Sequence, residues 1–496
     1  MDAQLEAKDG TTKETLTKRS TSKQVILALL TNFSSIGPSM TLGFSAVVIP
    51  TLKKTFTDDQ VSWFASITAL AAPFGCFFSG PIADRFGRRA AIFCINITCF
   101  IGWMTIYVAH RLHEDKYWLL LLGRLLTGFS VGLSSAPATI YMAEVSSSSL
   151  RTMFTTWGSI SFSTGILAVY ILGFFLKESW GLMALVTCAF PCLGIAFIAF
   201  LVPESPSWLV GKNRLDEAKN NMCQVFGTKE YNPYVQSEVE ALIKAKGVKA
   251  STQTKPMLEQ MLRKVKYLLE PQCLKPFTLV FVYFIFQQFA GTFVLVFYAV
   301  DIVTKAGVSL DPYLTTVMIG AIRLGTAVLV SCISKRFGRR PLSIASGLGM
   351  TLCMLVLACH CLLVNHHQVG GNLETKLTII PLLCLLLHFV ASTLGFLPMP
   401  FALAAEVFPT KIRGTASGLL AGSGYLFNFI VVKVYPSMVK SVGSTGVFFF
   451  YGGVSLLGTV FVTCLLPETK GKSLQEILEY FGEKPDVETG EKKPLE

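Results

Sequence analysis

Charge is scarce in this chain of 496 residues: Asp, Glu, Lys and Arg together make up 15% of it, whereas 52% of the residues are hydrophobic. So few charges cannot cover a globular surface with polar groups, which excludes an ordinary soluble protein. Runs of about 20 apolar residues recur instead, and this length matches the hydrocarbon thickness of a bilayer. The sequence therefore predicts an all-α polytopic membrane protein.

Groupings of side chains that perform covalent or metal chemistry are also missing. The predicted spans contain no nucleophile beside a base and no cluster of metal ligands, so we expect no enzyme, no metal site and no cofactor. Cys359, His360 and Cys361 lie in one helical stretch without further ligands, and helix packing explains them better than a metal does. Most of the 13 cysteines fall inside apolar segments, which argues against a disulfide framework.

Twelve apolar spans are expected, six in an N-terminal half at 24–202 and six in a C-terminal half at 276–466. A polar linker at 203–275 separates the halves, and polar segments at 1–23 and 467–496 flank them. Apolar residues in the linker recur near helical spacing, which predicts amphipathic helices on the cytoplasmic face. Those residues are Leu215, Ala218, Met222, Val225 and Phe226. The spans are expected at 24–50, 62–83, 90–110, 117–142, 153–176, 181–202, 276–304, 312–334, 341–364, 377–404, 414–436 and 444–466.

The net charge of +12 would suit a nucleic-acid partner, but the placement of the basic residues favours a membrane explanation. Most Lys and Arg lie in segments on one side of the predicted bilayer, which predicts cytoplasmic N- and C-termini. About two dozen polar residues precede the first apolar run, so no cleavable signal peptide is expected. That segment carries no clear acidic dileucine signal, and the plasma membrane is the expected location. The lipid bilayer and a small-molecule substrate are the expected partners.

The two halves of the chain carry the same motifs in the same order. The motif Asp84–Arg89 returns in near copy as Lys335–Arg340. Two more pairs follow in the same order: Ala143-Glu144-Val145 with Arg151 matches Ala405-Glu406-Val407 with Arg413, and Pro203-Glu204-Ser205 matches Pro467-Glu468-Thr469. A repeat of this length indicates a duplicated half-protein rather than a solenoid of short units.

These motifs, together with Gly123-Arg124, Gln287-Gln288 and Pro467–Gly471, resemble those of the sugar porter family of the major facilitator superfamily. The resemblance covers nearly the whole chain, and within the family it is greatest to insect facilitative trehalose transporters and their relatives. It implies a twelve-helix fold of two pseudo-symmetric six-helix halves. It also implies a transporter that moves a sugar, trehalose or a hexose, by alternating access.

Arginines and carboxylates at matched positions in the two halves suggest a cytoplasmic latch that ties the halves together when that side is shut. Each exposed pair contributes about 0–1 kcal/mol, but several together can bias an equilibrium between two states. The alternative is that the arginines only enforce topology. The expected latch residues are Asp84, Arg85, Arg88, Arg89, Glu144, Arg151, Glu204, Arg336, Arg339, Arg340, Glu406, Arg413 and Glu468.

Gln287 and Gln288 lie in otherwise apolar surroundings in the seventh span. An amide both donates and accepts hydrogen bonds, which suits sugar hydroxyls, and a polar group in a bilayer should face protein or a cavity. Two glutamines that only bond neighbouring helices are the alternative. The resemblance implies that both contact substrate and that Phe297 and Tyr298 form the extracellular gate. In the tenth span, prolines at 398 and 400 should break the helix, as is common at transport sites.

Four further positions of the expected site depart from the family's pattern. Ser159 and Phe293 replace a frequent Gln and Asn, Phe401 replaces a Trp, and Gly424-Tyr425 replaces an Asn-Trp pair. We keep Ser159, Phe293, Phe401 and Tyr425 as substrate-binding candidates. Since a buried unmet hydroxyl costs about 1–3 kcal/mol, these changes predict weaker binding of a common hexose.

Proton coupling is argued from the first span. Proton-coupled relatives place an acidic residue in a Gly-Tyr-Asp type segment, which aligns with Gly43-Phe44-Ser45. Ser45 cannot be deprotonated at physiological pH, and Asp301, near the outer end of the seventh span, is the one Asp or Glu deep in any predicted span. The pattern favours facilitated diffusion (uniport). A proton-coupled symporter and a non-transporting nutrient sensor are the alternatives.

Two arginines interrupt the apolar spans. The resemblance assigns Arg124 to the cytoplasmic-side gating and coupling machinery. Arg323 lies near the middle of the eighth span, where a cation is costly unless it faces a cavity or a partner. It either contacts an anionic substrate or anchors polar groups of the seventh span. A less polar or anionic small molecule is therefore the alternative to a sugar as substrate.

Overall fold

A computed structural model describes residues 20–112, 116–146, 148–228, 233–247, 266–333, 337–366, 379–409, 412–470, 472, 476 and 479–481. Within these residues the regular structure is helical and contains no strand. Ten of the described helices are long and apolar enough to cross a membrane. The prediction of a polytopic helical membrane protein is therefore confirmed.

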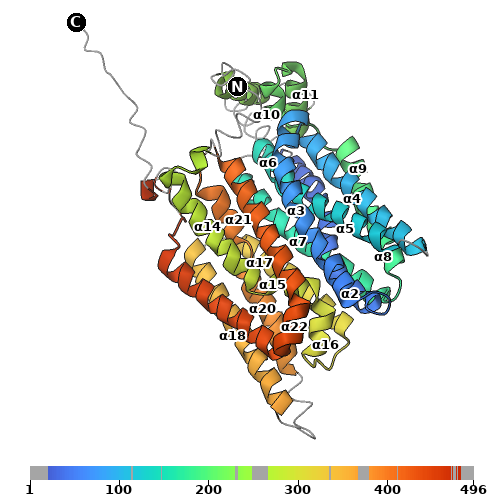
Figure 1. Ribbon diagram of the computed structural model, residues 1–496. Helices are drawn as coiled ribbons and strands as arrows, with labels where there is room; N and C mark the ends of the chain where they lie inside the picture. The colour runs from blue at the N-terminus through green and yellow to red at the C-terminus, as the bar shows by residue number, and fades with distance from the viewer. Residues whose placement is uncertain are drawn as a thin grey trace, which may run out of the picture.

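The N-terminal half forms six spans (Figure 1). A helical stretch at 20–33 leads into the first, while α5 with α6 and α8 with α9 each make up one span. The helices are α2 (Ile36–Leu52), α3 (Asp58–Phe86), α4 (Arg88–Arg111), α5 (Lys116–Leu133), α6 (Pro137–Val145), α7 (Ser148–Phe175), α8 (Trp180–Thr187) and α9 (Ala189–Phe200).

The C-terminal half repeats this arrangement with more interruptions. Its first span is broken into three pieces, and its last two are merged in one long helix that bends at Gly443, whose φ is 71°. The helices are α14 (Pro271–Phe289), α15 (Thr292–Phe297), α16 (Ala299–Lys305), α17 (Pro312–Ile333), α18 (Arg339–His366), α20 (Ile379–Leu394), α21 (Met399–Glu406) and α22 (Arg413–Leu465). With the broken and merged helices counted in this way, the described residues form the twelve expected spans.

Three short helices connect the halves: α10 (Pro206–Gly211), α11 (Leu215–Phe226) and α12 (Pro233–Gly247). On α11, Ala218, Met222 and Val225 are buried, as their helical spacing predicts. The linker helices α10 and α11 lie together at one end of the bundle, at the top of Figure 1. We call this the linker end, and the other, where α2 ends and α16 lies, the opposite end.

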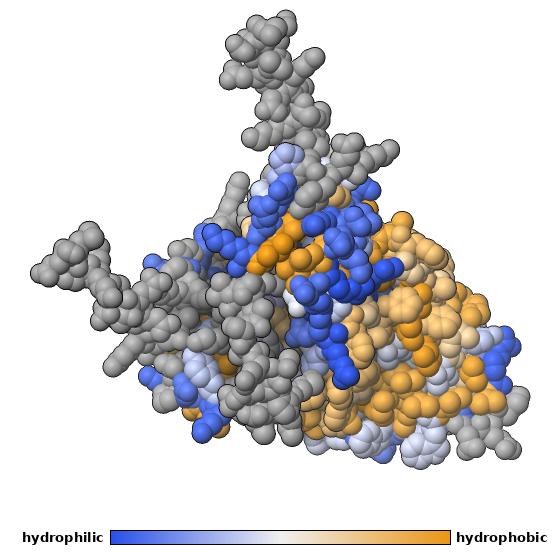
Figure 2. Space-filling model, turned by 90° about the horizontal axis from the view of Figure 1, so that it is seen from above, coloured by the Kyte–Doolittle hydropathy of each residue, from blue (hydrophilic) through white to orange (hydrophobic). Residues whose placement is uncertain are grey.

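The surface suits a bilayer. Seen from the linker end, hydrophilic residues gather over the linker helices, while the flank below them is broadly hydrophobic (Figure 2). Large apolar side chains such as Phe74, Leu352 and Leu457 are each more than 60% exposed. Apolar surface of this extent is stable only against lipid.

The hydrophobic core is shared between the halves at one end only. One cluster joins Phe44 of α2 and Phe64 of α3 to Phe297 of α15 and Tyr451 of α22. Towards the linker end each half has a cluster of its own, the N-terminal one around Ile92, Tyr141 and Phe154, the C-terminal one around Phe284, Phe396 and Phe408. The two halves thus share one apolar core at the opposite end, whereas towards the linker end each half has its own.

Glycines allow α3 and α5 to touch along their backbones. A Cβ at Gly132 of α5 would lie 1.9 Å from the carbonyl oxygen of Ala72, and one at Gly75 of α3 would lie 2.2 Å from the carbonyl oxygen of Phe129. Small residues of this kind drive helix association in membranes, where burial from water supplies no force. The contact fixes the helix that carries Arg124.

Replacing Gly132 by Ala tests this close packing. The added methyl group must push α3 and α5 apart, and overpacking of this kind destabilises a protein by about 1–3 kcal/mol. We expect a lower apparent melting temperature of the detergent-solubilised protein, followed by tryptophan fluorescence. Gly453→Ala in α22 is the matched control, because nothing lies within 4 Å of the Cβ added there. Equal melting temperatures for the two variants would contradict the packing.

Candidate functional site

A chain of amides lies where the first C-terminal span breaks. Gln287 and Gln288, near the end of α14, are each only 2% exposed. Gln287 Nε2 donates to the carbonyl oxygen of Leu397 at 2.6 Å, and Gln288 Nε2 donates to Gln287 Oε1 at 3.0 Å. Both side chains therefore face protein rather than lipid, as the cost of an unpaired amide in hydrocarbon requires.

Asn428 of α22 completes the chain, and sequence reasoning did not identify it. Its Nδ2 donates to Gln288 Oε1 at 3.1 Å, while its Oδ1 is buried with no partner among the described residues. Asn428 lies one helical turn after Gly424, where the family's amide is missing, so it presents an amide on the same face. A search one turn either side of each altered position would have found it. The chain thus ends in an unused hydrogen-bond acceptor.

An aromatic wall lies beside these amides. Phe401 of α21 is 39% exposed and meets Phe284 of α14 edge to face, with ring centroids 4.9 Å apart. A Cβ at Gly424 would lie 2.8 Å from the ring of Phe284. The glycine therefore makes room for Phe284, and the space that an Asn side chain would occupy in relatives is filled by a ring.

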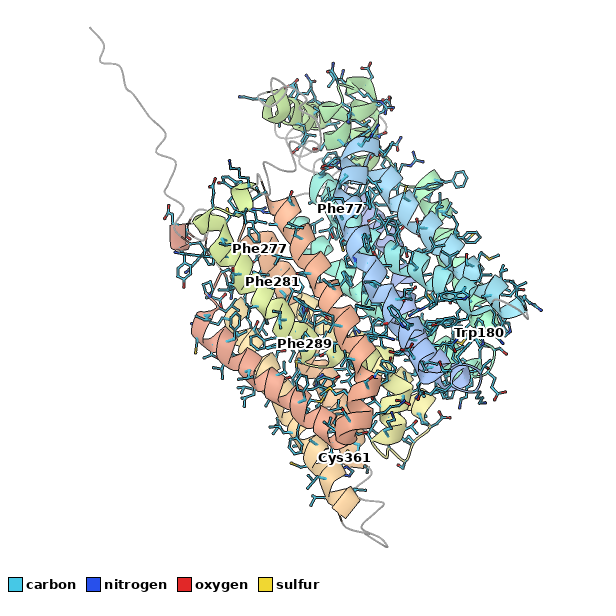
Figure 3. All side chains as sticks on the ribbon, in the orientation of Figure 1. Phe77, Trp180, Phe277, Phe281, Phe289 and Cys361 are labelled. Atoms are coloured by element: carbon cyan, nitrogen blue, oxygen red, sulfur yellow. The ribbon has the colours of Figure 1, made fainter. Side chains whose placement is uncertain are left out.

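More aromatic rings hold the broken span in place. Phe277, Phe281 and Phe289 follow α14 from the linker end towards the break (Figure 3). Phe281 and Phe289 both contact the ring of Phe427 of α22, at 5.3 and 6.4 Å between centroids. Edge and tilted ring pairs of this kind are favourable, so α14 is fixed against α22. This packing positions Gln287 and Gln288.

The break itself depends on Gly291. Its φ of 87° lies in the left-handed region that favours glycine, and an added Cβ would lie 2.5 Å from the ring of Tyr451. The six residues of α15 that follow are all buried, among them Phe293, which is 9% exposed. Phe297 and Tyr298 are buried too, and the Tyr298 ring packs 4.7 Å from that of Tyr435. The two expected gate residues therefore lie inside the shared core at the opposite end.

The remaining substrate-binding candidates lie at different depths. Ser159 is exposed on α7, and its hydroxyl donates to the carbonyl oxygen of Thr156 in its own helix. Tyr425 is half-buried on α22, next to Gly424. Of the expected set, the structure brings Gln287 and Gln288 into direct contact, whereas no described contact joins Ser159 to them.

Ion pairs between the halves surround the shared core. Lys53 at the end of α2 lies 2.7 Å from Asp301 of α16, and Asp301 also pairs with Lys305 at 2.8 Å. Sequence reasoning missed the pair of Lys53 with Asp301, because it joins charges that lie far apart in the chain. Three further pairs cross between the halves here: Lys177 with Asp311, Asp59 with Lys433, and Asp58 with Lys440.

One of these carboxylates, Asp311, precedes α17 and lies outside the spans. The hydrogen bond from Lys177 and those from the N–H groups of Tyr313 and Leu314 hold the pKa of Asp311 below its ordinary value. A carboxyl with a lowered pKa supports the paired state above its ordinary pKa, and that support is lost only as the pH falls through the lowered value. The Asp311 carboxylate is therefore held in its charged form for Lys177.

Arg124 is completely buried and fully engaged. Its guanidinium donates to the carbonyl oxygens of Phe64 at 3.2 Å and Thr41 at 2.8 Å and to Ser45 Oγ at 2.5 Å. It also lies over the rings of Phe44 and Phe64. Arg124 lies eight residues into α5 from the opposite end, under the shared core and away from the basic turns at the linker end.

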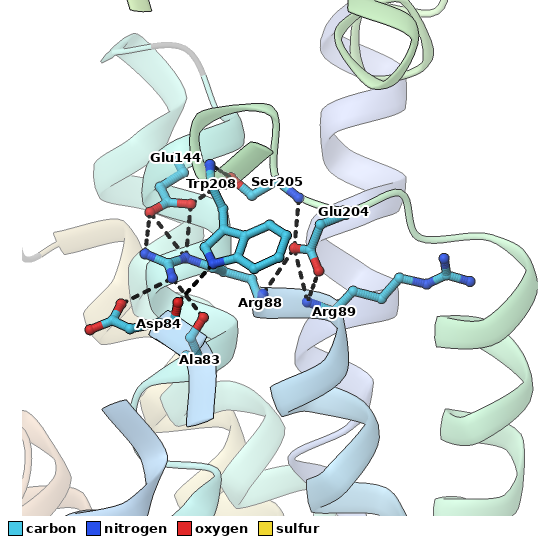
Figure 4. Close-up of polar contacts among 8 residues, drawn as sticks. All are labelled: Ala83, Asp84, Arg88, Arg89, Glu144, Glu204, Ser205 and Trp208. Atoms are coloured by element: carbon cyan, nitrogen blue, oxygen red, sulfur yellow. Dashed lines mark hydrogen bonds and ion pairs between the residues drawn. The ribbon is translucent and has the colours of Figure 1, made fainter. Parts of the chain in front are cut away.

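The basic turn between α3 and α4 closes a network within the N-terminal half (Figure 4). Arg88 Nη2 lies 2.8 Å from Glu144 Oε1, and its Nη1 lies 3.0 Å from Asp84 Oδ1. Glu204 accepts hydrogen bonds from the backbone N–H groups of Arg88 and Arg89, the first residues of α4. Ser205 Oγ bonds Glu144 at 2.5 Å and so joins the two parts. A carboxylate at a helix N-terminus is favourable electrostatically.

The C-terminal half carries the same network. Arg339 Nη2 lies 2.8 Å from Glu406 Oε1, and Thr469 Oγ1 lies 3.0 Å from Glu406 Oε2, in the role of Ser205. Glu468 accepts from the N–H groups of Arg339, Arg340 and Lys470. Desolvation works against ionisation of Glu468, but these backbone donors outweigh it and hold its pKa below the ordinary value.

In this structure these ion pairs all close within one half. The duplication explains this: each half carries a complete set of arginine, carboxylate and hydroxyl, so each satisfies itself. Arg85 is exposed with its guanidinium over the Phe86 ring, and Arg413 donates to the carbonyl oxygen of Phe408. The side chain of Arg151 and all of Arg336 lie outside the described residues.

The described residues contain no group of three or more His, Cys, Asp or Glu that could hold a metal ion. His388, completely buried on α20, places Nε2 3.2 Å from Thr292 Oγ1 of α15. The arrangement offers hydrogen bonds, aromatic rings and charge, which are the means of binding rather than of covalent chemistry.

Residues 5–481 match the family described as "Sugar (and other) transporter". Similar curated proteins include the facilitated trehalose transporter Tret1 of Polypedilum vanderplanki, 26% identical over 92% of this chain and 87% of that protein. The Tret1 of Culex quinquefasciatus is 27% identical over 92% of this chain and 85% of that protein.

Solved structures show the same fold. The inward open xylose transporter XylE from E. coli matches with a TM-score of 0.74 at 21% identity, over 92% of this chain and 99% of that one. The proton:xylose symporter XylE bound to 6-bromo-6-deoxy-D-glucose matches with a TM-score of 0.71 at 22% identity, over 93% of this chain and 100% of that one. A family match over nearly the whole length, on a twelve-span helical fold, places this chain in the sugar porter family of the major facilitator superfamily.

Proposed function

We propose that this protein carries a neutral sugar, trehalose or a hexose, across the plasma membrane by facilitated diffusion. The observation that carries the proposal is the buried amide chain at the break of the seventh span, which ends in the free acceptor of Asn428. Relatives named as facilitated trehalose transporters support the choice of sugar. Binding and movement are the whole activity, with no catalysis.

The substrate would exchange hydrogen bonds with this amide chain. Gln287 and Gln288 now bond Leu397 and one another, so a sugar hydroxyl entering beside them replaces protein partners rather than water. Such an exchange changes the free energy little, which lets a carrier release what it binds. Phe401, half-exposed, gives the apolar face of a sugar ring a surface to rest on.

The apolar core, which the halves share at the opposite end only, supports transport by alternating access. The positive-inside pattern supports a cytoplasmic linker end with both termini on that side. On this assignment the opposite end is extracellular, and Phe297, Tyr298 and the ion pairs around Asp301 form a closed outer gate. We propose that the outer gate opens when the two networks at the linker end meet and act as the latch.

Facilitated diffusion is supported by the surroundings of Arg124. The position at which proton-coupled relatives carry an acid holds Ser45, whose hydroxyl lies 2.5 Å from the guanidinium. A hydroxyl cannot cycle a proton at physiological pH, and Arg124 is satisfied without a carboxylate. The cation therefore serves a structural purpose between α2, α3 and α5.

Uptake of radiolabelled trehalose and glucose by cells that lack their own sugar transport tests the function. Gln288→Ala removes the centre of the amide chain and should raise KM about tenfold, because unpaired partners cost about 1–3 kcal/mol. Asn96→Ala is the control: Asn96 is equally buried, but its Nδ2 donates to Ser34 within the N-terminal half, and KM should not change. Absence of sugar uptake by well-expressed wild type would contradict the proposed function.

A second experiment imposes a pH gradient on proteoliposomes. We expect labelled sugar to equilibrate without accumulating, and the initial rate to vary little between about pH 5 and 8, since no group at the Ser45 position titrates there. The measurement is the ratio of internal to external sugar at steady state. Accumulation above equilibrium that collapses when a protonophore is added would contradict uniport.

Asp301→Asn tests the outer gate. The substitution removes two ion pairs, one of them between the halves, and should favour the outward-open state by about 1 kcal/mol, or about fivefold. A cysteine placed at Val296, which is buried in α15, should then react correspondingly faster with an impermeant thiol reagent added outside, as followed by mass spectrometry. Lys54→Ala is the matched control, because Lys54 pairs with Glu178 inside its own half. The idea fails if both variants react alike.

A further inference from the structure

Arg323 is a buried cation that the protein leaves unused. It lies near the middle of α17 and is 4% exposed, and its Nε and Nη1 have no hydrogen-bond partner among the described residues. A guanidinium is always charged and has five donors to satisfy. A charge in this position is expensive in a membrane and usually marks the path of a substrate or ion.

Arg124 shows how this chain treats a buried guanidinium that has only a structural purpose. Two carbonyl oxygens, one hydroxyl and two aromatic rings surround it. Arg323 has an equally buried position without such a set. The difference indicates that the partner of Arg323 is not part of the protein.

The described spans offer no carboxylate that could become this partner in another state. Their acidic residues lie in the terminal turns or in the short helix α16: Asp58, Asp59, Asp84, Glu144, Asp301 and Glu406. Arg323 is at least ten residues from either end of α17, which is about 15 Å along the helix. When two halves rock about a central site, side chains at the helix ends do not travel this far along the axis.

Arg323 also lies at the boundary between the halves. One turn away on α17, Gly320 packs against Leu167 and Tyr170 of α7, so a Cβ there would lie 3.0 Å from the Tyr170 ring. Nearer the linker end, Thr156 of α7 and Ser331 of α17 are 2.8 Å apart. Under alternating access the translocation path runs along such a boundary.

We propose that Arg323 binds an anion in the translocation path. The anion is either the carboxylate of a sugar-sized substrate, such as a sugar acid, or a chloride ion that enters from solution. This inference rests on the proposed function as a carrier of sugar-sized molecules and extends its substrates to organic anions. A guanidinium whose Nε and Nη1 are unpartnered can donate to the oxygens of a carboxylate.

The test compares uptake of labelled D-glucuronate and trehalose into proteoliposomes that hold wild type, Arg323→Gln or Arg323→Lys. We expect wild type to carry glucuronate, and Arg323→Gln to lower the ratio of glucuronate to trehalose uptake about tenfold or more. Arg323→Lys, which keeps the positive charge but not the planar guanidinium with its paired N–H donors, should give an intermediate ratio. Arg111→Gln is the matched control: it removes an exposed arginine at the end of α4 and should leave the ratio unchanged.

A second arm replaces chloride by methanesulfonate. If chloride is the anion, trehalose uptake by wild type should change severalfold, and Arg323→Gln should not respond. The inference is overturned if wild type neither carries glucuronate nor responds to chloride, or if Arg323→Gln leaves both responses as in wild type. If Arg323→Gln does not fold, wild type alone still tests the inference. Its glucuronate uptake, its response to chloride and the shift in melting temperature of the purified protein on adding glucuronate are then the measurements.

The two proposals fail separately. Trehalose uptake without any effect of either anion would overturn the role of Arg323 and leave the sugar carrier standing. Glucuronate uptake without trehalose uptake would overturn the neutral substrate and support the anion site.

Discussion

Inside a bilayer every polar group has to be paired within the protein, and this requirement shapes the whole structure. Hydroxyls such as those of Thr98 and Thr164 donate to the carbonyl four residues earlier in their own helices. The amides of Gln287 and Gln288 bond one another and the carbonyl oxygen of Leu397 at the break in the tenth span. Pairing is incomplete at some buried groups in both halves, among them Asn428 and Arg323 in the C-terminal half. A buried unsatisfied group is costly, so Asn428 beside the amide chain and Arg323 at the boundary between the halves call for a functional explanation.

The two ends of the bundle are held by different forces. At the opposite end a continuous apolar cluster spans both halves, and exposed ion pairs surround it. Dispersion and close packing in that cluster supply most of the attraction, because each exposed pair contributes little. At the linker end the apolar clusters are separate, and ionic networks brace each half internally. A carrier needs such a balance, since a core shared at both ends would leave no path between the halves.

The sequence alone predicted the fold well, because the length of the apolar runs corresponds to the membrane-spanning helices and the duplicated motifs correspond to the two halves. It also matched Ser45 to the acid of proton-coupled relatives, and the contact with Arg124 gives that position a physical meaning. It could not predict which carboxylate an arginine meets: matched motifs in two halves suit pairing across the halves and within each half equally well. The outer pairs, such as Lys53 with Asp301, depend on how the halves pack, which no local pattern encodes. Asn428 could not be predicted from the family's aligned positions, because it shares a helix face with Gly424 one turn away and does not occupy one of them.

Aromatic replacement changes what the central site can recognise. Phe284 fills the space beside Gly424, so the site loses a donor and an acceptor that relatives have and gains an apolar wall with Phe401. Asn428 restores one amide a turn away, but its donor is already engaged with Gln288. The amide chain therefore offers one free acceptor, Oδ1 of Asn428, and the unpartnered donors Nε and Nη1 of Arg323 lie on α17. A hydroxyl donor suits the acceptor of Asn428 and a negative group suits Arg323, so the two proposals depend on different unused groups.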